Sequence, residues 1–186
     1  MAYPLTAVHR DAPDFLLTMN ACEIGVEVTE ATSTEYAAYC ALAEHEFPNS
    51  LLEPALFRPN TPKRGKAELR AILAGRRLVS SGWGGDSAER EWAEGITARV
   101  TAKLDALGRP DFARFRENWL LVYDNLPLPA LHMSVAVSAL QTALAPTWSK
   151  QPHFTHVFVL SGASLIELTC DATRALAVID VWRSAA

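Results

Sequence analysis

Cysteine is scarce in this sequence, and the few cysteines form no recognisable pattern. The 186 residues contain three of them, Cys22, Cys40 and Cys170, which are far apart and include no C-x-x-C pair. An odd number of widely spaced cysteines excludes a disulfide framework and a cysteine-rich zinc site. The sequence therefore predicts three small, buried side chains that stay reduced.

Long apolar runs are also absent. A transmembrane helix needs roughly 18 or more consecutive apolar residues, and no segment of this chain approaches that length. The segment Met1 to Asp11 contains no basic stretch followed by an apolar run, which a secretory signal requires. The sequence therefore predicts a soluble cytoplasmic protein without a membrane partner.

An excess of basic charge is missing as well. Lys and Arg number 17 against 21 Asp and Glu, and the resulting net charge of −4 argues against a protein that coats nucleic acid non-specifically. Basic residues nevertheless gather between Pro62 and Arg77, where the only acid is Glu68. The predicted nucleic-acid-binding residues of this patch are Lys63, Arg64, Lys66 and Arg70. The alternative is that the patch is the solvated face of a helix.

Two β-rich runs, Asp14–Met19 and Cys22–Thr29, flank Asn20-Ala21 and predict a β-hairpin. If Met19 faces Cys22 across the turn, Asp14 lies directly opposite Glu27. Because side chains of a strand alternate between its two faces, both acids then project from the same face. The apolar side chains of the other face, which is predicted to be core, are Phe15, Leu17, Ile24, Val26 and Val28.

Two directly opposed acids destabilise a sheet unless another group compensates their charge. A bound divalent cation is the simplest compensation. Mg²⁺ prefers oxygen ligands, takes one or two protein carboxylates and keeps several waters. Asp14 and Glu27 are therefore predicted to be the ligands of a Mg²⁺ ion.

The rest of the chain alternates between helical and strand patterns. Helices are predicted from a capping box at Thr32 and Glu35 onward, and over Lys66–Arg77, Glu89–Leu107 and Met133–Leu144. Strands are predicted over Trp119–Asp124, Phe154–Leu160 and Ser164–Thr169. The uninterrupted apolar run of the first of these predicts a strand that is covered on both faces. The whole pattern predicts an α/β fold, a mixed central sheet with flanking helices, in a single domain of residues 1–186.

The motif around the two acids resembles a known family. Pro13-Asp14, followed after a short turn by Glu27-x-Thr29 and then by a helix, is similar to the PD-(D/E)xK superfamily, which includes many restriction and repair nucleases. The resemblance implies a restriction-endonuclease-like fold in which Asp14 and Glu27 bind the metal. The residues before the motif leave little room for the family's first helix and strand, and Thr29 stands where the family has a lysine.

Lys103 is the predicted replacement for that lysine. It lies between Val100 and Leu107 on the apolar stripe of the helix Glu89–Leu107. A buried ammonium group without a partner is costly, and the family tolerates a lysine that has moved to another element. Lys103 is therefore predicted to face Asp14 and Glu27 as the third catalytic residue. The alternative is that it snorkels from the edge of the stripe.

These observations lead to two main hypotheses about function. The first is a Mg²⁺-dependent nuclease-like hydrolase that acts on phosphodiester bonds in nucleic acid. The second is a catalytically inactive nuclease-like fold that serves as a nucleic-acid-binding or protein-interaction module. A third hypothesis is a subunit whose protein partner, or second copy in a homo-oligomer, completes the fold.

Overall fold

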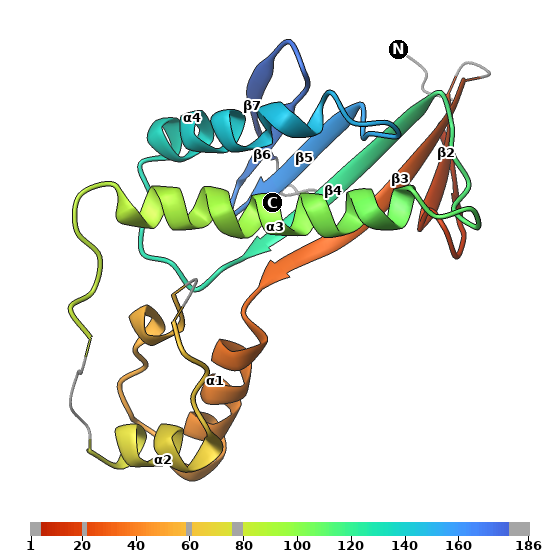
Figure 1. The fold of residues 1–186 in the computed structure, drawn as a ribbon. Coiled ribbons are helices and arrows are strands. Elements are labelled where there is room, and N and C mark those ends of the chain that lie inside the picture. Colours follow the sequence, from red (N-terminus) through yellow and green to blue (C-terminus); the bar gives the residue numbers. More distant parts are fainter. Residues whose placement is uncertain (1–4, 20–21, 59–60, 76–79, 179–186) are drawn as a thin grey trace, which may run out of the picture. The chain divides into compact units, whose positions relative to one another are not determined.

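Seven strands lie side by side in one mixed sheet, in the order in which they occur along the chain (Figure 1). The structure is a computed structural model that describes residues 5–19, 22–58, 61–75 and 80–178. The strands are β1 (Leu5–His9), β2 (Phe15–Met19), β3 (Cys22–Thr32), β4 (Glu117–Asn125), β5 (His156–Ser161), β6 (Ser164–Leu168) and β7 (Thr173–Ala177). The helices are α1 (Thr34–Glu46), α2 (Lys66–Gly75), α3 (Ser87–Leu107) and α4 (Met133–Leu144), with short 3-10 turns η1 (Pro54–Phe57) and η2 (Ala145–Thr147). The predicted α/β fold with a mixed sheet and flanking helices is confirmed.

The internal contacts of the chain divide it into two compact units. The sheet unit comprises Met1–Ala31, Ile96–Asp124 and Gln141–Ala186. The helical unit comprises Thr32–Gly95 and Asn125–Leu140. The single domain of residues 1–186 stays a prediction. Within the described part of the chain, no helix combines the length and the apolar character that crossing a bilayer would need.

Strand direction follows from the places where helical segments interrupt the sequence. β1, β2 and β3 pair antiparallel, with Met19 opposite Cys22 at the predicted turn. β4 and β5 pair parallel, and α4 lies between them in the sequence. β5, β6 and β7 are again antiparallel. Parallel neighbours need a long crossover connection, whereas antiparallel neighbours need only a tight turn.

A first strand does precede the acidic motif. β1 (Leu5–His9) occupies the few residues before Asp14 and pairs with β2. Five residues are enough for a strand of ordinary length.

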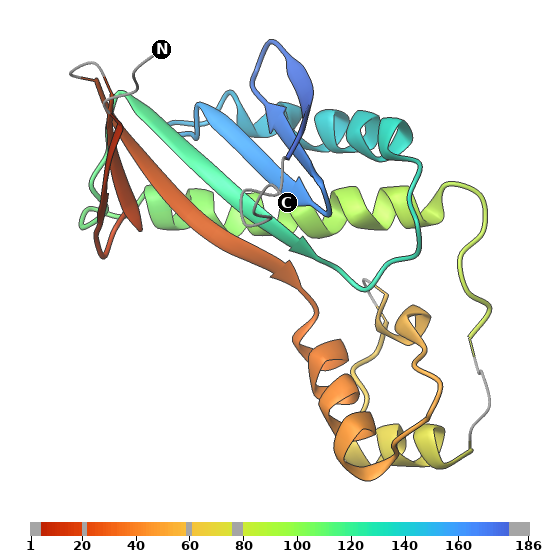
Figure 2. The same cartoon turned by 180° about the vertical axis from the view of Figure 1, so that it is seen from behind.

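The sheet is covered by α3 on one face. In Figure 1 the second half of α3 lies across the strands, and in the view from behind α3 passes on their far side (Figure 2). On β4, Leu120 and Val122 are fully buried, whereas Tyr123 is 48% exposed. The prediction that the strand Trp119–Asp124 is covered on both faces is therefore wrong. On the less covered face, aromatic rings pack on one another, and the Trp119 and Phe158 centroids lie 5.2 Å apart.

The predicted apolar side of the hairpin is buried only in part. Ile24 and Val26 of β3 are 3% and 9% exposed, but Phe15 of β2 is 36% exposed. The strands nearer the sheet edge have neighbours on fewer sides, so their apolar side chains lose less contact with water.

The helical unit has its own core, which joins α1, η1 and α2. The aromatic rings of Tyr39 and Phe57 lie 5.0 Å apart, and Tyr39 is fully buried. Burial raises the pKa of the neighbouring Tyr36 to about 12. The N-cap of α1 is Ser33 and not the predicted Thr32, because the Ser33 hydroxyl accepts the hydrogen bond from Tyr36 N at 3.2 Å. Glu35 accepts from Arg64 N and so does not complete the predicted capping box.

The cysteines differ from expectation in their burial. Cys22 and Cys40 are half-buried and Cys170 is exposed, so the prediction of three buried side chains is wrong. Cys170 lies between β6 and β7, where the chain turns at the surface. All three thiols are free in the structure, as the spacing predicts.

Gly25 on β3 supports the packing beneath the acidic motif. A Cβ atom added at Gly25 would lie 2.6 Å from the Phe115 ring, which is closer than carbon atoms pack, and 3.0 Å from Pro13 Cγ, which is a tight contact. The backbone of Phe115 is held in turn by Asn118, whose side chain accepts from Phe115 N at 3.0 Å and donates to Phe115 O at 2.8 Å. Gly25 therefore lets the segment before β4 lie directly on β3.

Gly25→Ala should destabilise the protein by about 1–3 kcal/mol, because overpacking a filled site displaces its neighbours. Urea unfolding monitored by circular dichroism measures the change. Gly84→Ala is the matched control, because nothing lies within 4 Å of a Cβ atom added there, and it should change stability by no more than about 0.5 kcal/mol. Equal stability of the two variants would contradict the packing described for Gly25.

Candidate active site

The hairpin register places Asp14 opposite Glu27. The paired residues run from Met19 and Cys22 to Phe15 and Val26, so the next positions outward are Asp14 and Glu27. Asp14 Oδ2 accepts a hydrogen bond from Val28 N at 2.7 Å, which ties the aspartate to β3 just beyond the last paired residues. The predicted position of the two acids on neighbouring antiparallel chain segments is confirmed.

Lys103 contacts Glu27 from α3. Its Nζ atom donates to Glu27 Oε1 at 2.5 Å, and the side chains are 29% and 9% exposed, respectively. The predicted inward direction of Lys103 is therefore confirmed, and simple snorkelling away from the sheet is not observed. A carboxylate as buried as Glu27 needs a cation or several donors, because burial without them carries a large desolvation cost.

The second oxygen of Glu27 has no such partner. Glu27 Oε2 is buried, and none of the described protein groups donates a hydrogen bond to it. A buried acceptor that lacks a donor costs about 1–3 kcal/mol, and more when it is charged. This oxygen is therefore the acceptor in the site that a water or a cation could satisfy.

The residues at this position fit a hard divalent cation. Asp14 and Glu27 offer carboxylate oxygens, and one oxygen of Glu27 is unsatisfied. Among the described residues no cluster of three or more His, Cys, Asp or Glu side chains gathers. A cation held here would therefore have two protein carboxylates and otherwise water as ligands, which is how Mg²⁺ commonly binds.

Thr29 follows Glu27 by two positions and so projects from the same face of β3. Its hydroxyl carries no charge, so this position supplies no cation to the site. Lys103 brings the positive charge from α3 instead.

The predicted nucleic-acid-binding residues lie in the helical unit, whereas Asp14, Glu27 and Lys103 belong to the sheet unit. Arg70 forms two hydrogen bonds to Glu46, which hold the pKa of Glu46 below its ordinary value. Arg64 Nη1 donates to Leu56 O, and Arg64 Nε lies 3.5 Å from Glu68 Oε1. Lys63 and Lys66 are exposed. Carboxylates of the helical unit therefore partly neutralise the charge of the two arginines.

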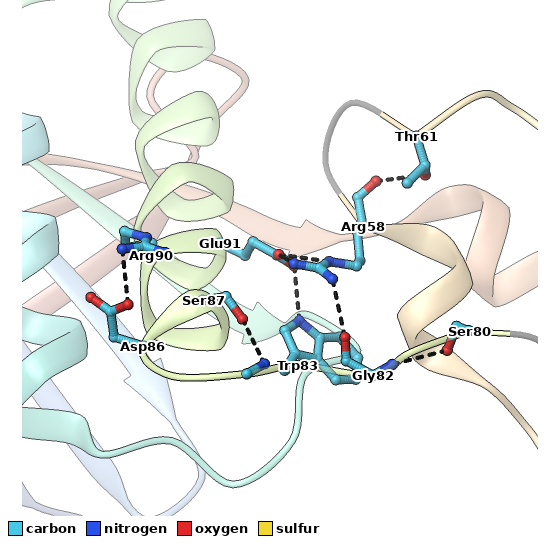
Figure 3. Close-up of polar contacts among 10 residues, drawn as sticks. Arg58, Thr61, Ser80, Gly82, Trp83, Asp86, Ser87, Arg90 and Glu91 are labelled. Carbon is cyan, nitrogen blue, oxygen red and sulfur yellow. Dashed lines mark hydrogen bonds and ion pairs between the residues drawn. The ribbon is translucent and has the colours of Figure 1, made fainter.

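The helical unit contains a polar cluster that the sequence pattern did not identify (Figure 3). Arg58 Nε and Nη2 both donate to Glu91 Oε1, and Trp83 Nε1 donates to Glu91 Oε2 at 2.9 Å. Arg58 Nη1 also donates to Gly82 O at 3.1 Å. The segment that precedes α3 is thus fastened to the helix through Gly82 and Trp83. In the sequence, a tryptophan within a glycine-rich segment was the feature that could have indicated this cluster.

Glu91→Ala should destabilise the protein by about 1–3 kcal/mol, because it leaves a guanidinium and an indole N–H without their acceptor. Arg90→Ala on the same helix is the matched control, since it breaks the exposed ion pair with Asp86, which is worth at most about 1 kcal/mol. Denaturant midpoints of the two variants distinguish the contributions. Equal midpoints would show that the cluster in Figure 3 adds nothing beyond a surface ion pair.

Comparisons with models of known protein families, with curated protein sequences and with solved structures find no significant match.

Mg²⁺ should raise the melting temperature, because a ligand that binds only the folded state stabilises it by about 2.7 kcal/mol at one hundred times its Kd. For a chain of this size that corresponds to roughly 5–10 °C. Asp14→Asn and Glu27→Gln should each abolish the increment in differential scanning fluorimetry. Glu23→Gln is the matched control, since Glu23 is an exposed acid on the same strand. An increment that survives in both site variants would place the cation elsewhere.

Proposed function

We propose that this protein is a divalent-cation-dependent hydrolase of phosphodiester bonds in nucleic acid, with a PD-(D/E)xK-type active site. The observation that carries the proposal is the placement of Asp14 opposite Glu27, with Lys103 bound to one oxygen of Glu27 and the other oxygen buried without a donor among the described residues. Two carboxylates and an ammonium group are the functional groups that metal-dependent phosphodiester hydrolysis uses.

The order of elements supports a restriction-endonuclease-like arrangement as part of the proposal. Three antiparallel strands come first, with Asp14 directly before β2 and Glu27 on β3, and α3 and the strand β4 follow later in the sequence. The lysine comes from α3, whereas the family motif places it on the strand of the second acid. A side chain on a helix that crosses the sheet can deliver its charge to the same point as a side chain on the strand.

Each residue has a definite part in the proposed reaction. Asp14 and Glu27 would hold the cation, which when bound supplies Lewis-acid polarisation of the phosphoryl oxygen and acidifies a bound water. Hydrogen bonding to Val28 N orients Asp14 before any ligand arrives. Lys103 Nζ, already at Glu27, can stabilise negative charge that develops on a phosphoryl oxygen.

The exposed Lys63 and Lys66 are proposed contacts for the phosphate backbone of the substrate. They lie at and just before the start of α2, and their side chains are accessible to solvent. Arg64 and Arg70 would contribute only if a phosphate replaced their carboxylate or carbonyl partners. These contacts would add affinity without sequence preference.

A cleavage assay tests the proposal. Wild-type protein should cleave labelled single-stranded or duplex DNA or RNA in the presence of Mg²⁺ or Mn²⁺, and EDTA should stop the reaction. Lys103→Ala should reduce kcat by about 100-fold or more, yet retain the Mg²⁺-dependent increment in melting temperature, because the lysine is not a metal ligand. Lys103→Arg checks folding, since it keeps the positive charge beside Glu27.

Lys150→Ala, which removes an exposed lysine of the sheet unit, should leave the rate unchanged and controls for general loss of charge. Equal cleavage by wild-type protein and Lys103→Ala would refute the role of Lys103. If wild-type protein binds these nucleic acids and cleaves none of them, the alternative of a catalytically inactive binding module is favoured.

A further inference from the structure

Arg10 lies on the same row across the sheet as the two acids. His9 pairs with Phe15 at the end of the β1–β2 ladder, so the next positions outward are Arg10 and Asp14. Their backbones remain connected, because Arg10 N donates to Asp14 O at 2.8 Å. Asp14 is in turn opposite Glu27. Directly opposed residues of neighbouring strands project from the same face, so Arg10 belongs to the face that carries the acids.

The guanidinium group of Arg10 contacts an aromatic ring and, within the described part of the chain, pairs with no carboxylate. Its Cζ atom lies 5.9 Å from the centroid of the Phe115 ring. The side chain is exposed, and none of the described carboxylates is within ion-pair distance of it, although Asp14 is directly opposite. A guanidinium that stacks on a ring keeps its N–H groups available for another partner.

The supporting ring is itself fixed in place. Phe115 lies directly on Gly25, where even a methyl group would collide with it, and both its backbone N–H and its carbonyl oxygen bond to the side chain of Asn118. Asn118 is 7% exposed. Phe115, whose backbone is held by the buried Asn118, therefore supports the exposed guanidinium of Arg10.

The charge distribution of the site favours a further positive group, such as the guanidinium of Arg10, for binding phosphate. Lys103 forms an ion pair with Glu27, and the side chain of Thr29 carries no charge. The carboxylates of Asp14 and Glu27 repel an approaching phosphodiester. An arginine offers a planar fork of N–H donors that matches two phosphate oxygens. We infer that Arg10 binds non-bridging phosphate oxygens of the substrate strand beside the carboxylate pair. This inference rests on the proposed nuclease function.

Binding and cleavage together test the inference. Binding is measured by fluorescence anisotropy of a fluorescein-labelled mixed-sequence DNA oligonucleotide, single-stranded or duplex, with Ca²⁺ in place of Mg²⁺ to prevent hydrolysis. Arg10→Ala should weaken binding and raise KM by about 10-fold. It should also lower the slope of log Kd against log salt by about one, because one phosphate contact is lost.

Two further variants separate a phosphate contact from a structural role. Arg10→Lys keeps the charge without the fork and should restore part of the affinity. Phe115→Leu should weaken binding less than Arg10→Ala does, since it removes only the support of the guanidinium. Arg174→Ala is the matched control: it removes an exposed arginine from β7 at the other side of the sheet and should leave Kd unchanged.

The Mg²⁺-dependent increment in melting temperature should persist in Arg10→Ala, because the arginine is not a metal ligand. If wild-type protein is active and Arg10→Ala matches it in Kd, KM and salt slope, the inference is wrong and the proposed function stands. If wild-type protein neither binds nor cleaves nucleic acid, both are overturned. Equal weakening by Arg10→Ala and Arg174→Ala would show a general effect of net charge and would also overturn the inference.

Discussion

The buried carboxylate of Glu27 is the constraint on which the site depends. A charge on a central strand of a sheet, under a helix, is stable only if opposite charge and hydrogen-bond donors surround it. Lys103 meets this requirement for one oxygen at 2.5 Å, and the other oxygen has no described donor. The contact requires α3 to cross β3 with Lys103 facing inward, so the position of the helix and the charge state of the site are linked. A cation would complete the compensation.

The site rests on main-chain geometry as much as on side chains. The ladder of β2 and β3 sets Asp14 opposite Glu27, and Val28 N holds the aspartate there. The absence of a side chain at Gly25 admits Phe115, whose ring lies under Arg10. Residues that carry no charge therefore determine where the charged groups lie. This type of support favours a preorganised site, in which ligand binding costs little rearrangement.

Carboxylates inside the helical unit reduce the net positive charge of the basic patch between Pro62 and Arg77. Arg70 with Glu46 forms a two-point contact on the surface, and Arg64 bridges the carbonyl of Leu56 and the carboxylate of Glu68. The carboxylate partner of Arg70 thus comes from α1, whereas Glu68, the partner of Arg64, lies within the patch itself. Local charge density along the sequence overestimates the charge that a polyanion would meet at this surface.

Some features of this protein followed from the sequence alone because they depend on short-range periodicity. The alternation of apolar and polar residues and the length of the turn set the hairpin register. The apolar residues of α3, which repeat with a period of 3.6, placed Lys103 on the inner face of the helix. Tertiary structure decided the rest. One-sided covering of β4, the carboxylate partner of Arg70, and the ring beneath Arg10 all involve contacts between residues that are distant in sequence. Such contacts leave no periodic trace, because any of several packings satisfies the same local pattern of apolar and polar residues.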